Sequence, residues 1–172
     1  YVPHPSSEHL GRIDLHLAVL SKLALEAGER IALPGLSEGW LRKQFNLKRA
    51  VQSLGLRVEG RSSVRIGNTH LSAFSRGDGT LGHQVGVLQG WIGQGDSWIL
   101  AGDMNMLPPG DDPARLEDSE SSYSDDPNPI LGLQPARFDV DRADLLSPNA
   151  RTYLPFGAAE PDRKIDYLLA SE

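Results

Sequence analysis

The chain has 172 residues, a formal net charge of −6 and a sequence pI near 5.3. That length fits one domain or part of one, and an apolar fraction of 39% suffices for a buried core, which excludes a chain that is disordered throughout. The absence of cysteine excludes disulfides, thiolate metal sites and cysteine nucleophiles, and no apolar run is long enough to span a membrane. No targeting segment is recognisable at the start of the sequence, so localisation stays open, as does oligomeric state.

The negative charge is concentrated in one proline-rich segment, residues 108–129. It contains seven Asp and Glu residues and one Arg, so the rest of the chain is neutral. Five prolines and almost no apolar periodicity predict a long solvated loop or a mobile lid. The acids lack the alternating spacing of a calcium-binding loop. No basic patch elsewhere is of the kind that marks a groove for duplex nucleic acid.

In chain order, the first half of the sequence predicts strands separated by irregular segments. A short apolar run over 15–21 predicts a buried strand, and residues 29–46, which Pro and Gly interrupt, are expected to be irregular. Alternation over 54–58 predicts the next strand. Residues 64–70 predict another strand, in which an apolar start and a polar end share one face.

The second half predicts one helix and two further strands. A helix is expected over 80–94, with a Thr as its N-cap and a Gly as its stop. Three glycines four residues apart on this helix each cost about 1 kcal/mol relative to Ala, which indicates either a very close neighbour or a poor helix. Strands follow at 98–105 and 163–171, and a period of two places Asp103 and Asn105 on one face. This order of elements favours a layered fold of the α/β (α+β) class over a sandwich of hairpins.

Polar side chains gather at the predicted strand ends. They are Asn68, His70, Asp103, Asn105 and Asp166. Hydrolysis of a phosphate ester needs a carboxylate to orient or deprotonate water, a cation to offset charge, and donors that hold the phosphoryl oxygens. The D-x-N pair supplies a carboxylate and an amide, and the preceding Gly permits a close backbone approach. Taken singly, His70 is more typical of a core or surface histidine, and Asp103 of a loop cap.

Three other patterns suggest different chemistry. The segment 77–82 (GDGTLG) matches the dinucleotide-binding pattern G-x-G-x-x-G, but six residues separate it from the preceding strand, and Asp78 would repel a pyrophosphate. Arg163 and Lys164 are placed to contact a substrate phosphate, or else form a solvated pair. Histidines near the start permit a metal site, although unspaced histidines near a terminus are usually solvated. These histidines are His4, His9 and His16.

Read together and in order, three motifs resemble the endonuclease/exonuclease/phosphatase superfamily: NTHL at 68–71, GDMN at 102–105 and DRKIDYLLAS at 162–171. LAVLS at 17–21 resembles a strand of that family, and FNLKRAV at 45–51 is similar to bacterial members of unassigned substrate. The superfamily comprises metal-dependent phosphoesterases that include DNase I, AP endonucleases, inositol polyphosphate 5-phosphatases and neutral sphingomyelinases. The resemblance implies a four-layer α/β sandwich of two mixed sheets with helices outside. It also implies Mg²⁺ or Mn²⁺ as cofactor, which suits hard carboxylate and amide oxygens.

The resemblance also implies a role for each polar strand end. His70 would stabilise the scissile phosphate, with Asn68 supporting that strand end. Asp103 would orient or deprotonate the attacking water, and Asn105 would hold the phosphate or a metal ligand shell. Asp166 would orient a catalytic histidine. The predicted catalytic residues are therefore His70, Asp103, Asn105 and Asp166, the predicted metal ligands Asp103 and Asn105, and the predicted substrate contacts Asn68 and Arg163.

Two parts of the family pattern do not match. The metal-binding Glu of the family precedes the LAVLS strand, where only Glu8 stands, and its Ser-Asp-His motif follows the KIDY strand, where this sequence stops at Glu172. The resemblance therefore predicts either a partial domain of a longer phosphoesterase or a truncated, inactive member that acts as a binding or scaffold module. The retained polar strand ends favour the first. The expected partner is a phosphate ester, whether small molecule, lipid headgroup or nucleic acid, and the acidic segment after GDMN disfavours duplex DNA.

Overall fold

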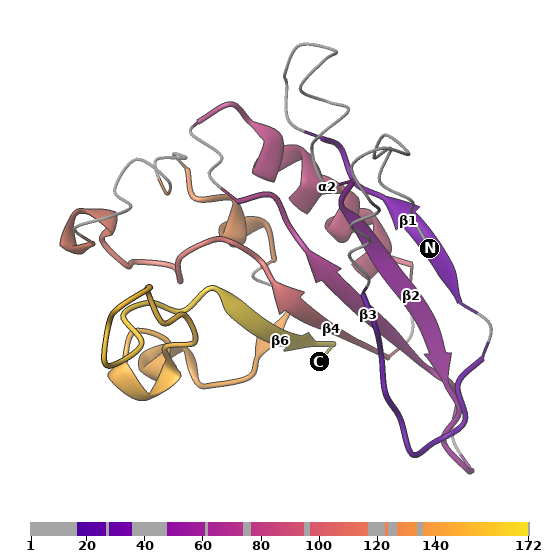
Figure 1. The fold of residues 1–172 in the computed structure, drawn as a ribbon. Helices are drawn as coiled ribbons and strands as arrows, with labels where there is room; N and C mark the ends of the chain where they lie inside the picture. Colours follow the sequence, from indigo (N-terminus) through magenta and orange to yellow (C-terminus); the bar gives the residue numbers. More distant parts are fainter. Residues whose placement is uncertain are drawn as a thin grey trace, which may run out of the picture.

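The computed structural model describes residues 17–26, 28–35, 48–60, 62–73, 77–94, 97–116, 123, 127–133 and 136–171. Six strands form one mixed sheet in the order β1-β2-β3-β4-β6-β5 (Figure 1). The strands are β1 (Glu29–Ala32), β2 (Ala50–Leu56), β3 (Val64–His70), β4 (Trp98–Asp103), β5 (Arg137–Phe138) and β6 (Asp166–Ala170). The described helices are α2 (Thr80–Ile92) and the short 3-10 helices η1 (Pro113–Arg115), η3 (Pro129–Leu133), η4 (Arg142–Asp144) and η5 (Pro148–Ala150).

Strand direction places several strand ends at one edge of the sheet. β3 and β4 are parallel neighbours joined through α2, so their carboxyl ends meet at the same edge. β2 is antiparallel to β3, and β6 is antiparallel to β4, so both of these strands begin at that edge. The topology therefore gathers residues from four neighbouring strands at one place.

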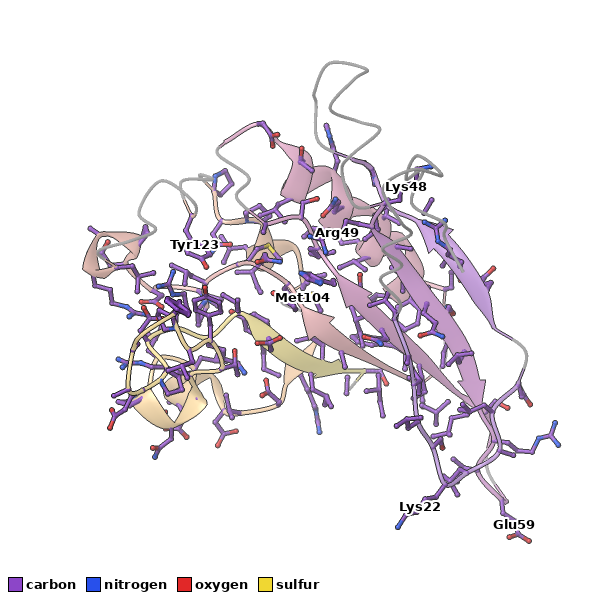
Figure 2. The ribbon with its side chains drawn as sticks, viewed as in Figure 1. Lys22, Lys48, Arg49, Glu59, Met104 and Tyr123 are labelled. Carbon is purple, nitrogen blue, oxygen red and sulfur yellow. The ribbon has the colours of Figure 1, made fainter. Side chains whose placement is uncertain are left out.

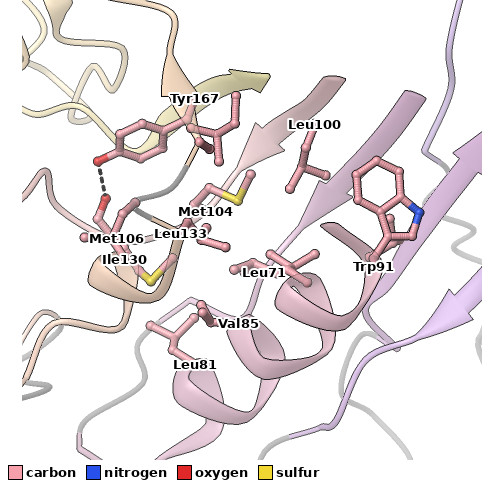
Figure 3. Packing of buried hydrophobic residues seen from close by; sticks show 14 of the residues in the cluster. Leu71, Leu81, Val85, Trp91, Leu100, Met104, Met106, Ile130, Leu133 and Tyr167 are labelled. Atoms are coloured by element: carbon pink, nitrogen blue, oxygen red, sulfur yellow. Dashed lines mark hydrogen bonds between the residues drawn. The ribbon is translucent and has the colours of Figure 1, made fainter. Parts of the chain in front are cut away.

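The helix α2 packs on one face of the sheet, where the core lies (Figure 3). Gly67 of β3 makes this possible, because a Cβ there would lie 2.7 Å from a Leu100 methyl carbon and 2.9 Å from the Trp91 ring. The Trp91 ring fills that space, and its Nε1 donates a hydrogen bond of 3.0 Å to Ser53 Oγ on β2. The helix is thus held to the sheet by both apolar burial and one buried hydrogen bond.

The predicted strand at 64–70 and the predicted helix after Gly79 are confirmed. The predicted ends of the helix are wrong: it spans Thr80–Ile92, so Thr80 is its first residue and not its N-cap, and the helix ends at Gly93 rather than after Gln94. The N-cap is Gly79, with φ 78°, and Asp78 Oδ1 accepts the Thr80 N–H at 2.8 Å. The GDGTLG segment thus serves to begin this helix. A Cβ at any of the three spaced helix glycines would meet nothing within 4 Å, so they mark a poor helix rather than a close neighbour. These are Gly82, Gly86 and Gly90.

Two predicted elements are wrong within the described residues. Residues 17–21 form no strand, because no backbone ladder to a neighbouring strand forms there; the Ala18 carbonyl instead accepts a hydrogen bond from the Asn68 side chain. Residues 29–32 were expected to be irregular but form the edge strand β1, which pairs with β2 through backbone hydrogen bonds that need no apolar pattern. The strand predicted at 98–105 ends two residues early, at Asp103, and the one predicted at 163–171 spans only 166–170.

The described residues form an α+β fold with a single mixed sheet. The two-sheet, four-layer sandwich stays a prediction. No helix in the described parts of the chain is both long and apolar enough to cross a membrane. Most of the acidic residues of segment 108–129 and all three N-terminal histidines, together with Glu8, lie outside the described residues.

Candidate active site

Three of the predicted site residues lie side by side across the sheet. The β3–β4 register places His70 opposite Asp103, and the β4–β6 register places Asp103 opposite Asp166. Residues directly opposite each other on neighbouring strands have their side chains on the same face. We call these three residues the polar row. It stands on the face opposite α2.

The two central members of the polar row contact each other. His70 Nε2 lies 3.4 Å from Asp103 Oδ2, and the side chains are 43% and 27% exposed. Burial lowers the pKa of His70, and the positive charge of Arg49 lowers it further, whereas Asp166 opposes this effect. Both effects favour the neutral form of His70 in its contact with Asp103.

Asp103 has the properties of a general base that operates near neutral pH. Burial raises its pKa to about 6, and the neighbouring charge of Asp166 adds to this rise. The backbone N–H of Asn105 and the charge of Arg49 act in the opposite direction. A carboxylate with a pKa just below the working pH is mostly ionised, yet more basic than a solvated one.

Asn105 reaches the site through a turn rather than through strand alternation. It follows the end of β4 and has φ 50°, in the left-handed region that Asn tolerates better than most residues. Its backbone N–H donates to Asp103 Oδ1 at 2.9 Å, and its Nδ2 donates to the Leu71 carbonyl at 3.0 Å. The expectation that Asp103 and Asn105 share a strand face is wrong, but the two residues are hydrogen-bonded neighbours.

Gly102 allows the close approach of β3 and β4 at this point. Its φ is 149°, and a Cβ at this position would overlap the carbonyl oxygen of Thr69, which is its register partner. No other residue type fits there without displacing β3. The predicted role of this glycine is therefore confirmed.

Asn68 lies on the same face as the polar row, two residues before His70, but its amide is engaged. Its Nδ2 donates to the Ala18 carbonyl at 3.0 Å and so ties the segment 17–21 to the sheet. The role that the resemblance implies for Asn68, support of this strand end, stays a prediction. A contact from Asn68 to substrate stays a prediction.

Arg163 and Lys164 are buried, so their alternative interpretation as a solvated pair is wrong. Each is 2% exposed. The Arg163 guanidinium donates to both carboxylate oxygens of Asp162 at 2.6 Å and lies 4.9 Å from the centre of the Tyr153 ring. Lys164 Nζ donates to Asp139 Oδ2 at 2.9 Å. Substrate contact by Arg163 stays a prediction, and it would have to compete with the Asp162 carboxylate.

Sequence reasoning missed three residues that border the polar row. Thr152 Oγ1 accepts the backbone N–H groups of Ile165 and Asp166, at 3.1 and 3.0 Å, and so fixes the start of β6. Tyr123 packs against Arg163, and burial raises its pKa. Arg49 stands directly before β2, at the same edge as His70 (Figure 2). Only Arg49 carried a sequence signal, a basic residue immediately ahead of a strand.

The chemistry of the site suits a divalent cation with few protein ligands. No group of three or more His, Cys, Asp or Glu in the described residues is arranged to hold a metal. Asp103 and Asp166 are nevertheless paired carboxylates, and the side-chain oxygen of Asn105 makes no hydrogen bond within the described residues. Mg²⁺ is commonly held by one or two carboxylates, with water and substrate phosphate completing its shell. The residues present therefore fit such an ion.

The sheet and α2 together form a fold that is similar to that of several solved structures. No family model matches the sequence, and no curated protein matches it. Among solved structures, an endonuclease/exonuclease/phosphatase from Beutenbergia cavernae aligns with a TM-score of 0.60 at 18% identity, covering 88% of this chain and 39% of that one.

Two vertebrate proteins of this fold are also similar. The human Nocturnin catalytic domain, solved with a bound sulfate, aligns with a TM-score of 0.53 at 17% identity, covering 99% of this chain and 59% of that one. A humanized D. rerio TDP2 aligns with a TM-score of 0.56 at 13% identity, covering 87% and 52%. The chain thus spans between 39% and 59% of the length of these three neighbours.

Proposed function

We propose that the protein is a metal-dependent phosphoesterase that hydrolyses a phosphate mono- or diester by in-line attack of water. The observation that carries this proposal is the polar row, in which His70, Asp103 and Asp166 adjoin on three neighbouring strands. The similar fold supports it, since one neighbour is named as an endonuclease/exonuclease/phosphatase, and a D. rerio TDP2 structure holds a single-strand DNA product. The substrate is an ester of phosphate whose alcohol part the polar row does not specify.

In this mechanism Asp103 takes the proton from the attacking water. Its Oδ1 is occupied by the Asn105 N–H, so Oδ2, the oxygen that faces His70, is the one available to water. His70, whose neutral form is favoured, donates a hydrogen bond from its ring N–H to a phosphoryl oxygen as negative charge develops there. Asp166 keeps Asp103 basic through its own negative charge.

A divalent cation, Mg²⁺ or Mn²⁺, would be held by the Asp103 carboxylate and the Asn105 amide oxygen. When bound, it supplies positive charge that offsets the charge on the phosphoryl oxygens. The turn after β4 orients both ligands, because the Asn105 N–H and side chain are each fixed by a hydrogen bond. Removal of the cation with a chelator is expected to abolish turnover, and its return to restore it.

Substitution of the two central residues tests the proposal. Asp103→Ala and His70→Ala are each expected to lower hydrolysis of bis(4-nitrophenyl) phosphate with Mg²⁺ by about 10²–10⁴-fold, the range typical of a lost acid–base group. The assay is run on the 172-residue chain and on the complete product of its gene. Asp144→Ala, an exposed carboxylate on η4, is the matched control and should leave turnover unchanged. Near-normal turnover in either site variant contradicts the assigned roles.

A catalytically inactive binding or scaffold module is the alternative, and it is considered because the chain aligns with only part of each neighbour. Calorimetric titration separates the two functions. A phosphoesterase is expected to bind Mg²⁺ through Asp103, so Asp103→Ala should lower the affinity for Mg²⁺. A module of the alternative kind would show no Mg²⁺ binding that depends on this residue, in either length of the protein.

A further inference from the structure

We propose that the loop 152–159, which we call the apolar loop, binds the surface of a lipid bilayer whose headgroups carry no net charge. The loop has the sequence TYLPFGAA and contains no charged residue. Three of its large side chains project into water: Tyr153 is 39% exposed, Leu154 is 52% exposed and Phe156 is exposed in full. This inference goes beyond the proposed function, because binding to a bilayer needs no hydrolysis.

Hydrogen bonds fix the apolar loop both at its base and at its tip. At the base, the Arg163 carbonyl accepts the N–H groups of Thr152 and Tyr153, both at 2.9 Å. At the tip, the Ala158 N–H donates to the Pro155 carbonyl at 3.0 Å and closes a tight turn. The aromatic ring at the tip is thus presented on a pre-organised backbone, so little entropy is lost when the ring enters another phase.

The base of the apolar loop is bonded to the polar row. Thr152 Oγ1 accepts the N–H of Asp166, the first residue of β6, at 3.0 Å. Figure 1 shows the loop, in yellow, beyond the start of β6 and on the other side of the molecule from the segment 17–25. A bilayer bound at the loop would therefore lie at the sheet edge that carries the polar row. Its headgroups would bring phosphate diesters to that edge, and this consequence alone rests on the proposed function.

The size and composition of the apolar loop fit a bilayer better than a protein partner. A protein–protein interface uses about 20–30 residues on each side, whereas the loop projects three large side chains. Phe and Leu side chains insert at the boundary between headgroups and acyl chains, and Tyr suits this boundary because one end of it is apolar and the other polar. A convex tip gains free energy there from the apolar area that leaves water.

Charge disfavours nucleic acid and anionic lipid as partners of the apolar loop. Nucleic acid is bound mainly by Lys and Arg at its phosphates, and the loop contains neither. Its immediate neighbours in sequence, Arg151 and Glu160, have opposite charges, and Arg163 is buried against Asp162 at 2.6 Å. The whole chain has a net charge of −6, which anionic headgroups would repel. A zwitterionic surface such as phosphatidylcholine is the partner that fits.

Flotation of the full-length protein with phosphatidylcholine vesicles tests the inference. Phe156→Ser is expected to lower the partition coefficient by about tenfold, because the transfer of one aromatic side chain out of water is lost. Leu20→Ser is the matched control, since this leucine is 97% exposed but lies on the segment 17–25, and it should leave partitioning unchanged. Binding should be the same at roughly 0.1 and 0.5 M NaCl, because salt screens charges and does not prevent apolar insertion.

Phe156→Trp gives a second readout that does not depend on loss of binding. The described tryptophans, Trp91 and Trp98, are buried, so the difference in emission from the unchanged protein reports the new side chain. This emission should shift to the blue when phosphatidylcholine vesicles are added, because the indole leaves water. A single-stranded oligonucleotide added at the same protein concentration should cause no shift.

The outcomes separate this inference from the proposed function. No flotation of the unchanged protein overturns the inference, and so does an equal loss in Phe156→Ser and Leu20→Ser. A shift of the Phe156→Trp emission by the oligonucleotide but not by vesicles also overturns it and identifies nucleic acid as the partner. Vesicle binding without hydrolysis that depends on Asp103 leaves the inference and overturns the enzyme. Hydrolysis that depends on Asp103 without vesicle binding leaves the enzyme and overturns the inference.

Discussion

The two faces of the sheet differ in what their side chains touch. On the face under α2, Leu100 and Leu169 are fully buried in the same core cluster as Trp91. Figure 3 shows Leu100 and Trp91 on this face. On the opposite face Leu168 is 47% exposed, and the polar row stands beside it. The same strands thus serve both purposes, because successive side chains point to opposite faces. The face under α2 stabilises the sheet through apolar burial. This stabilisation offsets the cost of the ionisable groups on the open face.

Among the described residues, the segment 17–25 lies over the open face of the sheet. It passes in front of β2 and β3 in Figure 1, is held by Asn68 at the Ala18 carbonyl, and pairs at Leu25 with Leu56. Its apolar side chains are mostly in solvent, and Leu20 is 97% exposed. This segment therefore contributes little apolar burial, and the open face depends on the covered face for its stability.

Substitution of two adjacent leucines of β6 is expected to show the largest difference in stability between the two faces. Leu169→Ala is expected to lower the free energy of unfolding by about 2–5 kcal/mol, because it leaves a cavity in the core. Leu168→Ala, one residue away on the open face, should change it by less than about 0.5 kcal/mol. Urea unfolding measures both. Similar losses in the two variants would show that the open face is covered.

Asp103→Asn tests how much the charge of the polar row lowers the stability of the open face. The folded-state pKa of Asp103 is about 6, above its ordinary value of 3.8, so its contribution to stability is full below pH 4 and is lost as the pH rises through 6. The amide carries no such penalty, and the metal-free variant should be more stable than the unchanged chain at pH 7 by about 1–3 kcal/mol. The difference should vanish below pH 4. Thermal unfolding at several pH values measures it, with the exposed Asp144→Asn as control, and an equal gain in that control contradicts the prediction.

Thr152→Val has the smallest expected effect. Its hydroxyl oxygen accepts two consecutive N–H groups at the start of β6, and their loss is expected to cost about 1 kcal/mol of stability. Thr152→Ser keeps the acceptor and should lose less. Because the bond to the Asp166 N–H orients that residue, Thr152→Val should also lower turnover more than Thr152→Ser does. Equal turnover in the two variants would show that the hydroxyl does not position Asp166.

The sequence was informative where the signal is local. The alternation over 64–70 predicted β3 with its correct bounds, and the apolar spacing after Thr80 predicted α2, although its N-cap is Gly79 rather than Thr80. Polar side chains at strand ends identified His70, Asp103 and Asp166, which the sheet then brings together. The edge strand β1 was missed, because an edge strand with both sides near solvent has no alternation to detect.

Which residues meet was decided by the tertiary structure. The turn that brings Asn105 back to Asp103 and the burial of Arg163 against Asp162 have no local pattern that reveals them. Sequence periodicity reports which face a side chain occupies, since that depends on its own strand alone. Register reports which side chains are neighbours, and it depends on the packing of α2 at Gly67 and the close approach at Gly102. The sequence therefore determined the kinds of groups at the strand ends, whereas only the folded sheet placed them in one row.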